Sequence, residues 1–565
     1  MKGIPASPGV AMARAVVIKE TPGVHKEPHG SVDSELCAFE AALTSMICRL
    51  DRLSSTDGEG SDILKTHSML LEDDTMIAPI RKMIAQDGCS AAYAVDSCMQ
   101  KTAGQFRSMP DEYMSSRAAD IDELRISFLN ELSGGSRRDY SAISENCVLI
   151  SHNPMLSDII QIDAKRLKAV VTETGSPTSH CAILARTRGI PAVMGMNGIC
   201  GAVKTGDLLI VDGNTGEVIP DPDKATVQRY AAEEENIRRR TNELNKYLDK
   251  PCLSADGKLI EISANIGSPA DVSAVLSANA DGIGLFRSEF LYIDKIEPPT
   301  EEEQFDAYRQ ILLAMKGKPV TVRTLDAGGD KRVPCLHLPR EDNPFLGYRA
   351  VRICLNDVSL FKTQLRALLR ASVYGNLRIM LPMISSVEEV RCARKIILDV
   401  CKELEAAGIE AARNVPVGVM IEVPSAALMA DEMAKEADFF SVGTNDLVQY
   451  VMAADRGNPG IAGLYSIYYP SVLRLLKSVA AAAHSANIPC GICGESAKEH
   501  EMLPLLIGFG FDEMSMSATS ILETKERISR LDSYACRDAA QRAAAATTRA
   551  EAFEILSSHL KRDKN

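Results

Sequence analysis

One histidine in the 565-residue chain is placed where it can react with an anion. His180 lies in the stretch TGSPTSHCAILARTRGIPAVMG, where Thr178 or Ser179 can cap a helix predicted over 181–188. A helix N-terminus presents unpaired N–H groups and the positive end of the helix dipole, which stabilise a bound phosphate. A neutral imidazole is also a nucleophile that forms covalent intermediates. Taken alone, the stretch fits a helix-capping histidine better. Two arginines of the same stretch would add positive charge, Arg186 and Arg188.

A second set of polar side chains follows apolar runs in the C-terminal half of the chain. Arginine guanidinium groups match phosphate and carboxylate, and carboxylates are ligands for Mg²⁺. A small substrate with one phosphate and one carboxylate would satisfy both kinds of side chain. A lone arginine at such a position is more often part of a structural ion pair, but several polar residues at several strand ends favour a site. The set consists of Arg287, Arg323, Glu422, Asn445, Asp446 and Arg456.

Cys493 also ends an apolar run, in the segment IPCGIC. Free cysteine is often buried as a small apolar side chain. Beside an anion site, however, a thiol with an ordinary pKa near 8.5 can protonate a carbanion or enolate at neutral pH. Cys490 and Cys493 form a C-x-x-C pair. A thioredoxin-like or zinc-binding interpretation is disfavoured, because the pair follows a strand-like run and no second Cys/His pair lies nearby in sequence.

Composition narrows the class of protein. Hydrophobic residues make up 45% and charged residues 25%, as in ordinary globular proteins, and no run is long and apolar enough for a membrane helix or a secretory signal. The net charge of −13 argues against nucleic acid and anionic membranes as partners. Fifteen cysteines without a repeated spacing fit reduced thiols. We therefore expect a cytoplasmic protein with no nucleic-acid partner and no membrane insertion.

The N-terminal half predicts an α/β domain that is interrupted by helices. An opening strand over 13–18 precedes a long helical region with apolar residues spaced three and four apart, typical of antiparallel helix packing. Short strands separated by turns follow, up to about residue 220. Because the opening strand would pair with these, we predict an α/β domain from residues 1–22 and 145–222 with an inserted helical bundle over 30–140. A charged linker helix is predicted over 223–250.

After residue 251, eight strand-like runs alternate with helical segments. This pattern predicts a (β/α)₈ barrel over 251–540, followed by a helical tail over 541–565. In that fold the chemistry lies at the carboxyl ends of the strands. Since the polar residues named above follow strand-like runs, the barrel would bring them to one mouth.

Taken together, the motifs resemble enzyme I of the bacterial phosphoenolpyruvate-dependent sugar phosphotransferase system. The resemblance covers nearly the whole chain and keeps the order of the family's blocks. Several blocks are short, but their combination is highly specific. They are GIPASPGVA, THSMLLEDD, RAADI, TSHCAILAR, GDLLIVDG, GIGLFRSEFLY, PTEEEQFDAYR, RTLDAGGDK, NPFLGYRA, IEVPSA, GTNDLVQY and CGICGE.

The resemblance implies a reaction and a role for each matching residue. Phosphoenolpyruvate would bind with Mg²⁺ in the barrel, its phosphoryl group would move to His180 with release of pyruvate, and a histidine of the small carrier protein HPr would receive it next. The inserted bundle would dock HPr, the α/β domain would swivel, and the barrel would form a homodimer. The remaining implied roles are substrate binding by Arg287, Arg323, Asn445, Asp446 and Arg456, Mg²⁺ binding by Glu422 and Asp446, protonation by Cys493, and added charge from Lys331 and Arg349.

The chain departs from the family pattern near the histidine. Ser176 and Pro177 stand where many members have Gly-Arg, and the preceding segment SHNPMLSD differs from the usual aspartate-containing loop. Pyruvate phosphate dikinase and phosphoenolpyruvate synthase share both domains but need a nucleotide-binding domain, and a nitrogen-regulatory relative needs an N-terminal sensor domain; we expect neither. The other alternative is a catalytically weakened regulatory relative, against which the retained reactive side chains argue.

Overall fold

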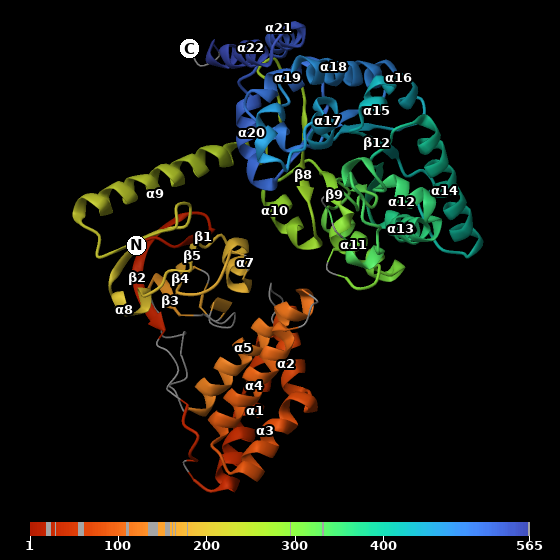
Figure 1. Cartoon of the computed structure of the whole chain (residues 1–565). Coiled ribbons are helices and arrows are strands. Elements are labelled where there is room, and N and C mark those ends of the chain that lie inside the picture. Colours follow the sequence, from red (N-terminus) through yellow and green to blue (C-terminus); the bar gives the residue numbers. More distant parts are fainter. Residues whose placement is uncertain are drawn as a thin grey trace. The chain divides into compact units, whose positions relative to one another are not determined.

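The structure is a computed structural model. It describes residues 1–565 except 19–23, 29, 55–60, 109–111, 134–144, 153–158, 161, 164, 178, 294, 330, 332 and 563–565. The chain divides into two compact units, Met1–Arg239 and Arg240–Asn565. Each unit is described by itself below, and Figure 1 gives the elements of both.

A seven-stranded mixed sheet forms the base of the first unit, with strand order β1-β5-β4-β3-β2-β6-β7. Strands β2 to β5 run parallel, and β1, β6 and β7 pair antiparallel to their neighbours. Both faces of the sheet are covered: helix α7 (His180–Thr187) packs on one and α8 (Ile199–Ala202) on the other. The strands are β1 (Ile4–Ser7), β2 (Val10–Ile18), β3 (Cys147–Ser151), β4 (Leu167–Thr172), β5 (Ala192–Met194), β6 (Leu208–Asp212) and β7 (Glu217–Pro220).

The start of the chain differs from the single strand predicted over 13–18. It forms two strands, β1 and β2, which lie at different places in the sheet. Gly9 lies between them with φ +121°, and a Cβ there would come within 2.9 Å of Pro191. Only glycine accepts this backbone conformation and this close approach without strain, so Pro8-Gly9 is the break that the sequence pattern did not reveal.

A helical bundle is inserted between β2 and β3 (Figure 1). Asp73 caps the N-terminus of α3 and Ser90 caps that of α4, each through its side-chain oxygen. Phe39 and Phe128 stack with ring centroids 5.2 Å apart and join the first and last helices of the bundle. The helices are α1 (Val32–Ser54), α2 (Ser61–Glu72), α3 (Asp74–Asp87), α4 (Ala91–Arg107) and α5 (Glu112–Leu132).

Helix α9 (Lys224–Leu244) contains the boundary between the two units. Tyr230, in its first half, is buried. Arg240, near its C-terminal end, donates to the carboxylate of Glu526 over 2.9 Å within the second unit. The two ends of the helix therefore belong to different units.

The second unit is a closed parallel barrel, which confirms the predicted fold class. All eight predicted strands are present: β8 (Glu261–Ile266), β9 (Ile283–Arg287), β10 (Pro319–Arg323), β11 (Asn376–Leu381), β12 (Val417–Ile421), β13 (Phe440–Val442), β14 (Cys490–Ile492) and β15 (Glu513–Met516). The helices of this unit are α10 (Val272–Ser277), α11 (Glu301–Ala314), α12 (Val351–Asn356), α13 (Val358–Ala371), α14 (Val387–Ala406), α15 (Pro424–Leu428), α16 (Ala430–Met433), α17 (Thr444–Met452), α18 (Pro470–Ser485), α19 (Met502–Phe509), α20 (Ile521–Ile528), α21 (Ser533–Ala545) and α22 (Arg549–Arg562).

The barrel has two apolar layers. Strand residues that point outward join the helices in one large core, whereas Leu285, Met380, Met420, Phe439 and Cys493 form a small separate core inside the barrel. Cys490 belongs to the outer core, so the two cysteines of the C-x-x-C pair lie in different layers. Both thiols are free, as are the other thirteen cysteines of the chain.

No helix within the described ranges has the length and apolar character that crossing a membrane requires.

Candidate active site

The structure places the predicted polar residues of the barrel at the carboxyl ends of its strands. Arg287 and Arg323 are the last residues of β9 and β10, Glu422 directly follows β12, and Cys493 directly follows β14. Asn445 and Asp446 lie in the first turn of α17, which begins two residues after β13. A closed parallel barrel brings all these ends to one mouth. Arg456 lies in the loop that follows α17.

Four charged side chains at this mouth form a closed set of ion pairs, which we call the charged ring. Arg323 donates to Glu289 and lies 3.1 Å from Asp326. Lys331 donates to the same two carboxylates, over 2.8 Å in the case of Glu289. Each cation thus contacts both acids. Three members are buried and Lys331 is 24% exposed, so the interactions are little screened by solvent.

Arg349 connects the charged ring to Asp446, which lies in the first turn of α17 after β13. Its guanidinium donates to Asp326 over 3.0 Å and to Asp446 over 3.3 Å. The side chain is fully buried, and its position requires glycine at residue 328: with φ +99°, a Cβ there would lie 2.6 Å from the Cβ of Arg349. Burial alone would lower the pKa of Arg349, but the charges of Asp326 and Asp446 outweigh it and raise the pKa above its ordinary value.

Two arginines at the mouth keep N–H groups for an anion. Arg323 uses Nη2 in the charged ring, while its Nε has no hydrogen-bond partner among the described residues and its Nη1 contacts only the sulfur of Met420. Arg287 forms no hydrogen bond or ion pair with any described residue and lines a cavity of about 320 Å³ together with Asn265 and Phe290. These arginines can therefore bind an anionic substrate without breaking a native contact.

Arg456 is held beside the same mouth by an aromatic ring. Its guanidinium lies 5.9 Å from the centroid of Phe345, and the guanidinium of Arg349 lies 6.0 Å from that centroid. A cation over an aromatic face is stabilised by the electron-rich ring. Phe345 thus brings Arg456 and Arg349 to one place, although neither the sequence spacing nor the strand pattern pointed to this phenylalanine.

Glu422 and Asp446 are suited to hold a divalent cation. Glu422 accepts from the Met383 N–H through one oxygen (2.6 Å), and Asp446 accepts from Arg349 through one oxygen. The second oxygen of each carboxylate has no hydrogen-bond partner among the described residues. Burial first, and the negative charge of Asp446 second, raise the pKa of Glu422 to about 8. A cation between the two carboxylates would relieve that repulsion, and Mg²⁺ is commonly held by two carboxylates with substrate oxygens. No group of three or more metal-ligating side chains occurs in the described part of the chain.

Cys493 directly follows β14 and belongs to the small core inside the barrel. Its Sγ is 3.6 Å from the Val442 carbonyl oxygen, and the side chain is buried against Met380 and Met420. Burial raises the pKa of the thiol to about 11, with smaller contributions from its neighbours. The sulfur therefore carries its proton at neutral pH, which is the form a general acid requires.

His180 is the first residue of α7, at the helix N-terminus that the sequence predicted. Ser179 is the N-cap, and its hydroxyl accepts from the Ala182 N–H over 3.3 Å. Of the two predicted capping residues, Thr178 lies outside the described residues, and so does the side chain of His180. The backbone thus has the geometry of an anion site, and the reactivity of the imidazole stays a prediction.

Arg186 on α7 and Arg188, the C-cap of α7, both donate to backbone carbonyl oxygens, which leaves the expectation that they add positive charge as a prediction. Arg186 donates to the carbonyl oxygens of Ala6 (2.7 Å) and Pro177 (3.0 Å), and Arg188 donates to that of Ile159 (3.1 Å). The Ser179 N–H also closes a turn onto the Ser176 carbonyl. These contacts hold the Ser-Pro segment against α7 through its backbone carbonyl oxygens.

Comparison with known proteins agrees with this division of the chain. Three family profiles match, described as the N-terminal, mobile and PEP-binding domains of PEP-utilising enzymes, over residues 2–117, 143–216 and 241–533. A phosphoenolpyruvate-protein phosphotransferase from Priestia megaterium is 44% identical over 538 residues, which cover 94% of each chain. The chain belongs to the phosphoenolpyruvate-protein phosphotransferase family. Relatives from Staphylococcus carnosus (41% identical, 99% of each chain) and Bacillus subtilis (42% identical, 94% of each chain) bear the same name.

Two buried acids of this phosphotransferase were not found from the sequence. Glu289 lies two residues after Arg287, and Asp326 three residues after Arg323. Each contacts two or three cations. Their closeness in sequence to the strand-end arginines was an available signal. It was not sufficient, because acids near arginines are common on surfaces.

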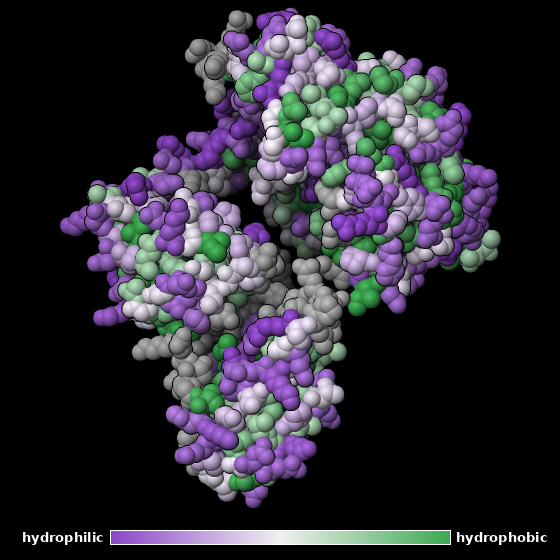
Figure 2. Space-filling model, in the orientation of Figure 1, coloured by the Kyte–Doolittle hydropathy of each residue, from purple (hydrophilic) through white to green (hydrophobic). Residues whose placement is uncertain are grey.

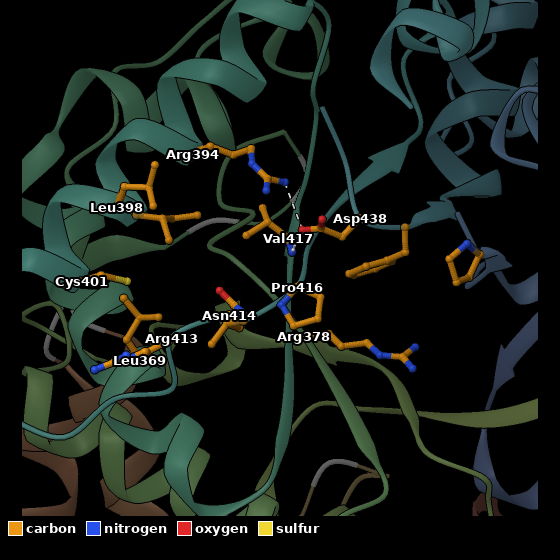
Figure 3. A pocket seen from close by; sticks show the side chains of 14 residues that line it. Leu369, Arg378, Arg394, Leu398, Cys401, Arg413, Asn414, Pro416, Val417 and Asp438 are labelled. Atoms are coloured by element: carbon orange, nitrogen blue, oxygen red, sulfur yellow. Dashed lines mark hydrogen bonds and ion pairs between the residues drawn. The ribbon is translucent and has the colours of Figure 1, made fainter. Parts of the chain in front are cut away.

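The opposite end of the barrel also holds a cavity, of about 470 Å³, lined by the amino ends of β11 and β12 and by α14 (Figure 3). Three arginines line it, but they do not converge. Arg394 pairs with Asp438 over 3.1 Å, and Arg378 and Arg413 lie on either side of Pro416. Among the described residues of this phosphotransferase, the arginines of the carboxyl-end mouth share acidic partners, whereas the three arginines of this cavity share none.

Proposed function

We propose that the chain transfers the phosphoryl group of phosphoenolpyruvate to His180, releases pyruvate, and passes the group to a histidine of the carrier protein HPr. This is the first step of the sugar phosphotransferase system. The observation that carries the proposal is the charged mouth of the barrel. There, arginines with free N–H groups lie beside two carboxylates that each keep a free oxygen.

Phosphoenolpyruvate carries a phosphate and a carboxylate, and the mouth offers a separate group for each charge. Arg287, Arg323 and Arg456 supply guanidinium groups and Asn445 an amide, which together suit two anionic groups. Glu422 and Asp446 would hold Mg²⁺, and the bound ion supplies positive charge for the phosphate oxygens. Because phosphoryl transfer depends mainly on positioning and on stabilising charge, this set is suited to the reaction.

In the chemical step, His180 accepts the phosphoryl group and Cys493 supplies the proton that completes pyruvate. The imidazole nitrogen attacks phosphorus, the bond between phosphorus and the enol oxygen breaks, and its electron pair remains on the enolate of pyruvate. The thiol of Cys493 then gives its proton to the methylene carbon of the enolate, which yields pyruvate. A pKa of about 11 keeps that thiol protonated at neutral pH until the enolate forms.

We assign HPr docking to the inserted bundle of α1 to α5. Met69, on α2, is 69% exposed, which makes it the most exposed large apolar side chain among the described residues of the bundle. An exposed apolar side chain on a helical surface suits a transient protein partner. We expect Met69→Asp to slow transfer to HPr at least tenfold and to leave labelling of His180 unchanged. Equal slowing of both half-reactions would contradict the assignment.

The barrel unit is proposed to form a homodimer in the cytoplasm. Figure 2 shows hydrophobic patches on the visible face of this unit, and Ile296, Leu346 and Leu428 are among its most exposed apolar side chains. Fifteen free cysteines suit a reducing compartment. Sedimentation equilibrium of the purified chain tests the dimer: a single monomer mass at micromolar concentration would contradict it.

One experiment tests the central proposal. Purified protein is incubated with Mg²⁺ and ³²P-labelled phosphoenolpyruvate, and the label and released pyruvate are counted. We expect about one equivalent of acid-labile label per chain, equimolar pyruvate, and no label in His180→Ala. That variant should still bind phosphoenolpyruvate by calorimetry. Absence of label from the wild-type chain would contradict the enzyme and favour a regulatory relative that binds without turnover.

A further inference from the structure

Glu289 has an unusual environment for a carboxylate. It lies in a short 3₁₀ turn, Ser288–Leu291, directly after β9, and is 1% exposed. One oxygen, Oε1, accepts both from Nη2 of Arg323 and from Nζ of Lys331. The other oxygen, Oε2, is buried and has no hydrogen-bond partner among the described residues. A single oxygen atom therefore joins two cations that reach it from β10 and from the loop after β10.

We propose that Glu289 is a positioning residue that fixes the guanidinium of Arg323 and the ammonium of Lys331 relative to each other, so that both cations face the phosphoryl group together. The role rests on the proposed function, in which Arg323 binds phosphoenolpyruvate. Glu289 itself touches no substrate in this proposal and acts through the two cations that its Oε1 joins.

The turn that carries Glu289 is itself fixed by buried hydrogen bonds. The hydroxyl of Ser288 donates to the backbone carbonyl of Arg323 over 2.6 Å, and the amide of Gln364 donates to that hydroxyl over 3.0 Å. All three side chains are buried. A residue that acts through others must be held in this way, because its own movement would be passed on to the groups it positions.

Asp326 cannot take over this role. One of its oxygens lies 3.0 Å from Arg349, and the other serves both Lys331 and Arg323, the latter at 3.1 Å. Without Glu289, Asp326 would be the one carboxylate among the described residues that pairs with Arg323 and Lys331, and it also pairs with Arg349. The guanidinium of Arg323 would then lose the hydrogen bond that sets its plane, since its remaining polar contacts with the described residues are the one to Asp326 and a weak one to the sulfur of Met420.

Two substitutions separate the effect of the shared oxygen of Glu289 from the effect of its negative charge. In Glu289→Gln, the amide oxygen can take the place of Oε1 and accept both hydrogen bonds, so only the charge is lost. In Glu289→Ala, both bonds are lost. A displacement of about 1 Å at a reacting group costs about a hundredfold in rate, whereas exchanging charge-assisted for neutral hydrogen bonds costs roughly fivefold.

The test measures initial rates of pyruvate release at a range of phosphoenolpyruvate concentrations with Mg²⁺, and thermal melting of each variant. The matched control is Glu301→Gln, since Glu301 on α11 also joins two cations, Arg366 at 2.7 Å and Arg370 at 2.6 Å, away from the strand ends. We expect kcat to fall about a hundredfold in Glu289→Ala and roughly fivefold in Glu289→Gln. The control should stay within about twofold of the wild type.

Several outcomes would overturn the role. A Glu289→Ala variant that melts lower but keeps its kcat would show a structural residue only, and a Glu289→Gln variant as slow as Glu289→Ala would show that charge, not the shared oxygen, matters. If Glu289→Ala fails to fold, a Glu289→Gln variant with the same rate as Glu301→Gln overturns the proposal. A wild-type chain that releases no pyruvate would instead contradict the proposed function, which this role requires.

Discussion

The two ends of the barrel carry the same kinds of charged side chains but arrange them differently. At the carboxyl end, Asp326 is fully buried and contacts three cations. At the amino end, Arg394 and Asp438 form a partly exposed pair, and Arg391 pairs in the same way with Glu436 (2.8 Å). The number of arginines does not distinguish the ends. What distinguishes the charged ring from these two pairs is that its charges are buried and shared, whereas those of the pairs are partly exposed and matched one to one.

This difference has a physical consequence for how each end responds to substitution. Exposed pairs are worth about 0–1 kcal/mol, because water and salt screen them. Removing one member of a buried set leaves its partners as uncompensated charges, which costs about 3–5 kcal/mol. The carboxyl end should therefore be sensitive to any single change and the amino end tolerant. The following substitutions test that contrast.

The largest effect is expected for Arg323→Ala at the carboxyl end. The variant loses the phosphate-binding groups and leaves Glu289 with one cation, so pyruvate release should fall at least about a thousandfold. Arg394→Ala, at the amino end, should stay within about twofold of the wild-type rate. Both are measured with lactate dehydrogenase coupled to pyruvate. An equal loss in the two variants would remove the functional distinction between the ends.

The same contrast should appear in stability. Asp326→Asn removes the negative charge that three cations share. The free energy of unfolding should therefore fall by about 3–5 kcal/mol. Asp438→Asn keeps an oxygen for the Val417 N–H and loses only an exposed ion pair, so its cost should stay below about 1 kcal/mol. Urea unfolding followed by circular dichroism measures both. Similar midpoints for the two variants would contradict the argument from burial.

Two cysteines, one on β14 and one directly after it, extend the comparison from the ends of the barrel to its inner and outer apolar layers. Cys493→Ala should slow pyruvate release about a hundredfold while phosphoenolpyruvate binding stays within twofold, because the thiol acts only on the enolate. Cys490→Ala, three residues earlier in the outer core, should lower the melting temperature by a few degrees and leave the rate unchanged. If both variants kept the wild-type rate, the acid would have to be another group.

The smallest effect concerns the pH at which Cys493 ionises. Its pKa is raised to about 11, so the thiolate is scarce at neutral pH and its fraction should rise about tenfold per pH unit well beyond pH 8.5. Alkylation of Cys493 by iodoacetamide, followed by mass spectrometry of its peptide between pH 7 and 9.5, should therefore show no plateau. A plateau near pH 8.5 would mean that burial does not perturb the thiol.

The sequence predicted most of the barrel because its strands are short apolar runs with a polar residue at the end. Arg287, Arg323, Glu422 and Cys493 could be named in this way, since their position depends only on the strand that precedes them. Other features depend on residues far away in the chain and have no local signal. Glu289 became recognisable only through Lys331, forty-two residues later, and Phe345 only through the two arginines beside its ring.

The N-terminal unit was less predictable for the same reason. The apolar pattern gave its strands and its helices, but not the break at Gly9, which depends on how closely Pro191 approaches. Arg186 and Arg188 were expected to act as charges because they follow His180 on one helix. The structure shows that they bond to backbone carbonyls of three other segments, and no pattern within α7 contains that information.

The helical bundle is inserted between two neighbouring strands of the sheet, β2 and β3, and this position determines how the bundle is attached to the sheet. Strands β2 and β3 are parallel neighbours, with Arg14 opposite Cys147 and Ile18 opposite Ser151, so the chain must return from Ile18 to the level of Arg14 before β3 begins. Such a return normally takes a single crossover helix. The bundle is therefore an enlarged crossover, tethered to the sheet at two points. A deletion that removes it will keep the sheet only if about a dozen residues remain to make the return.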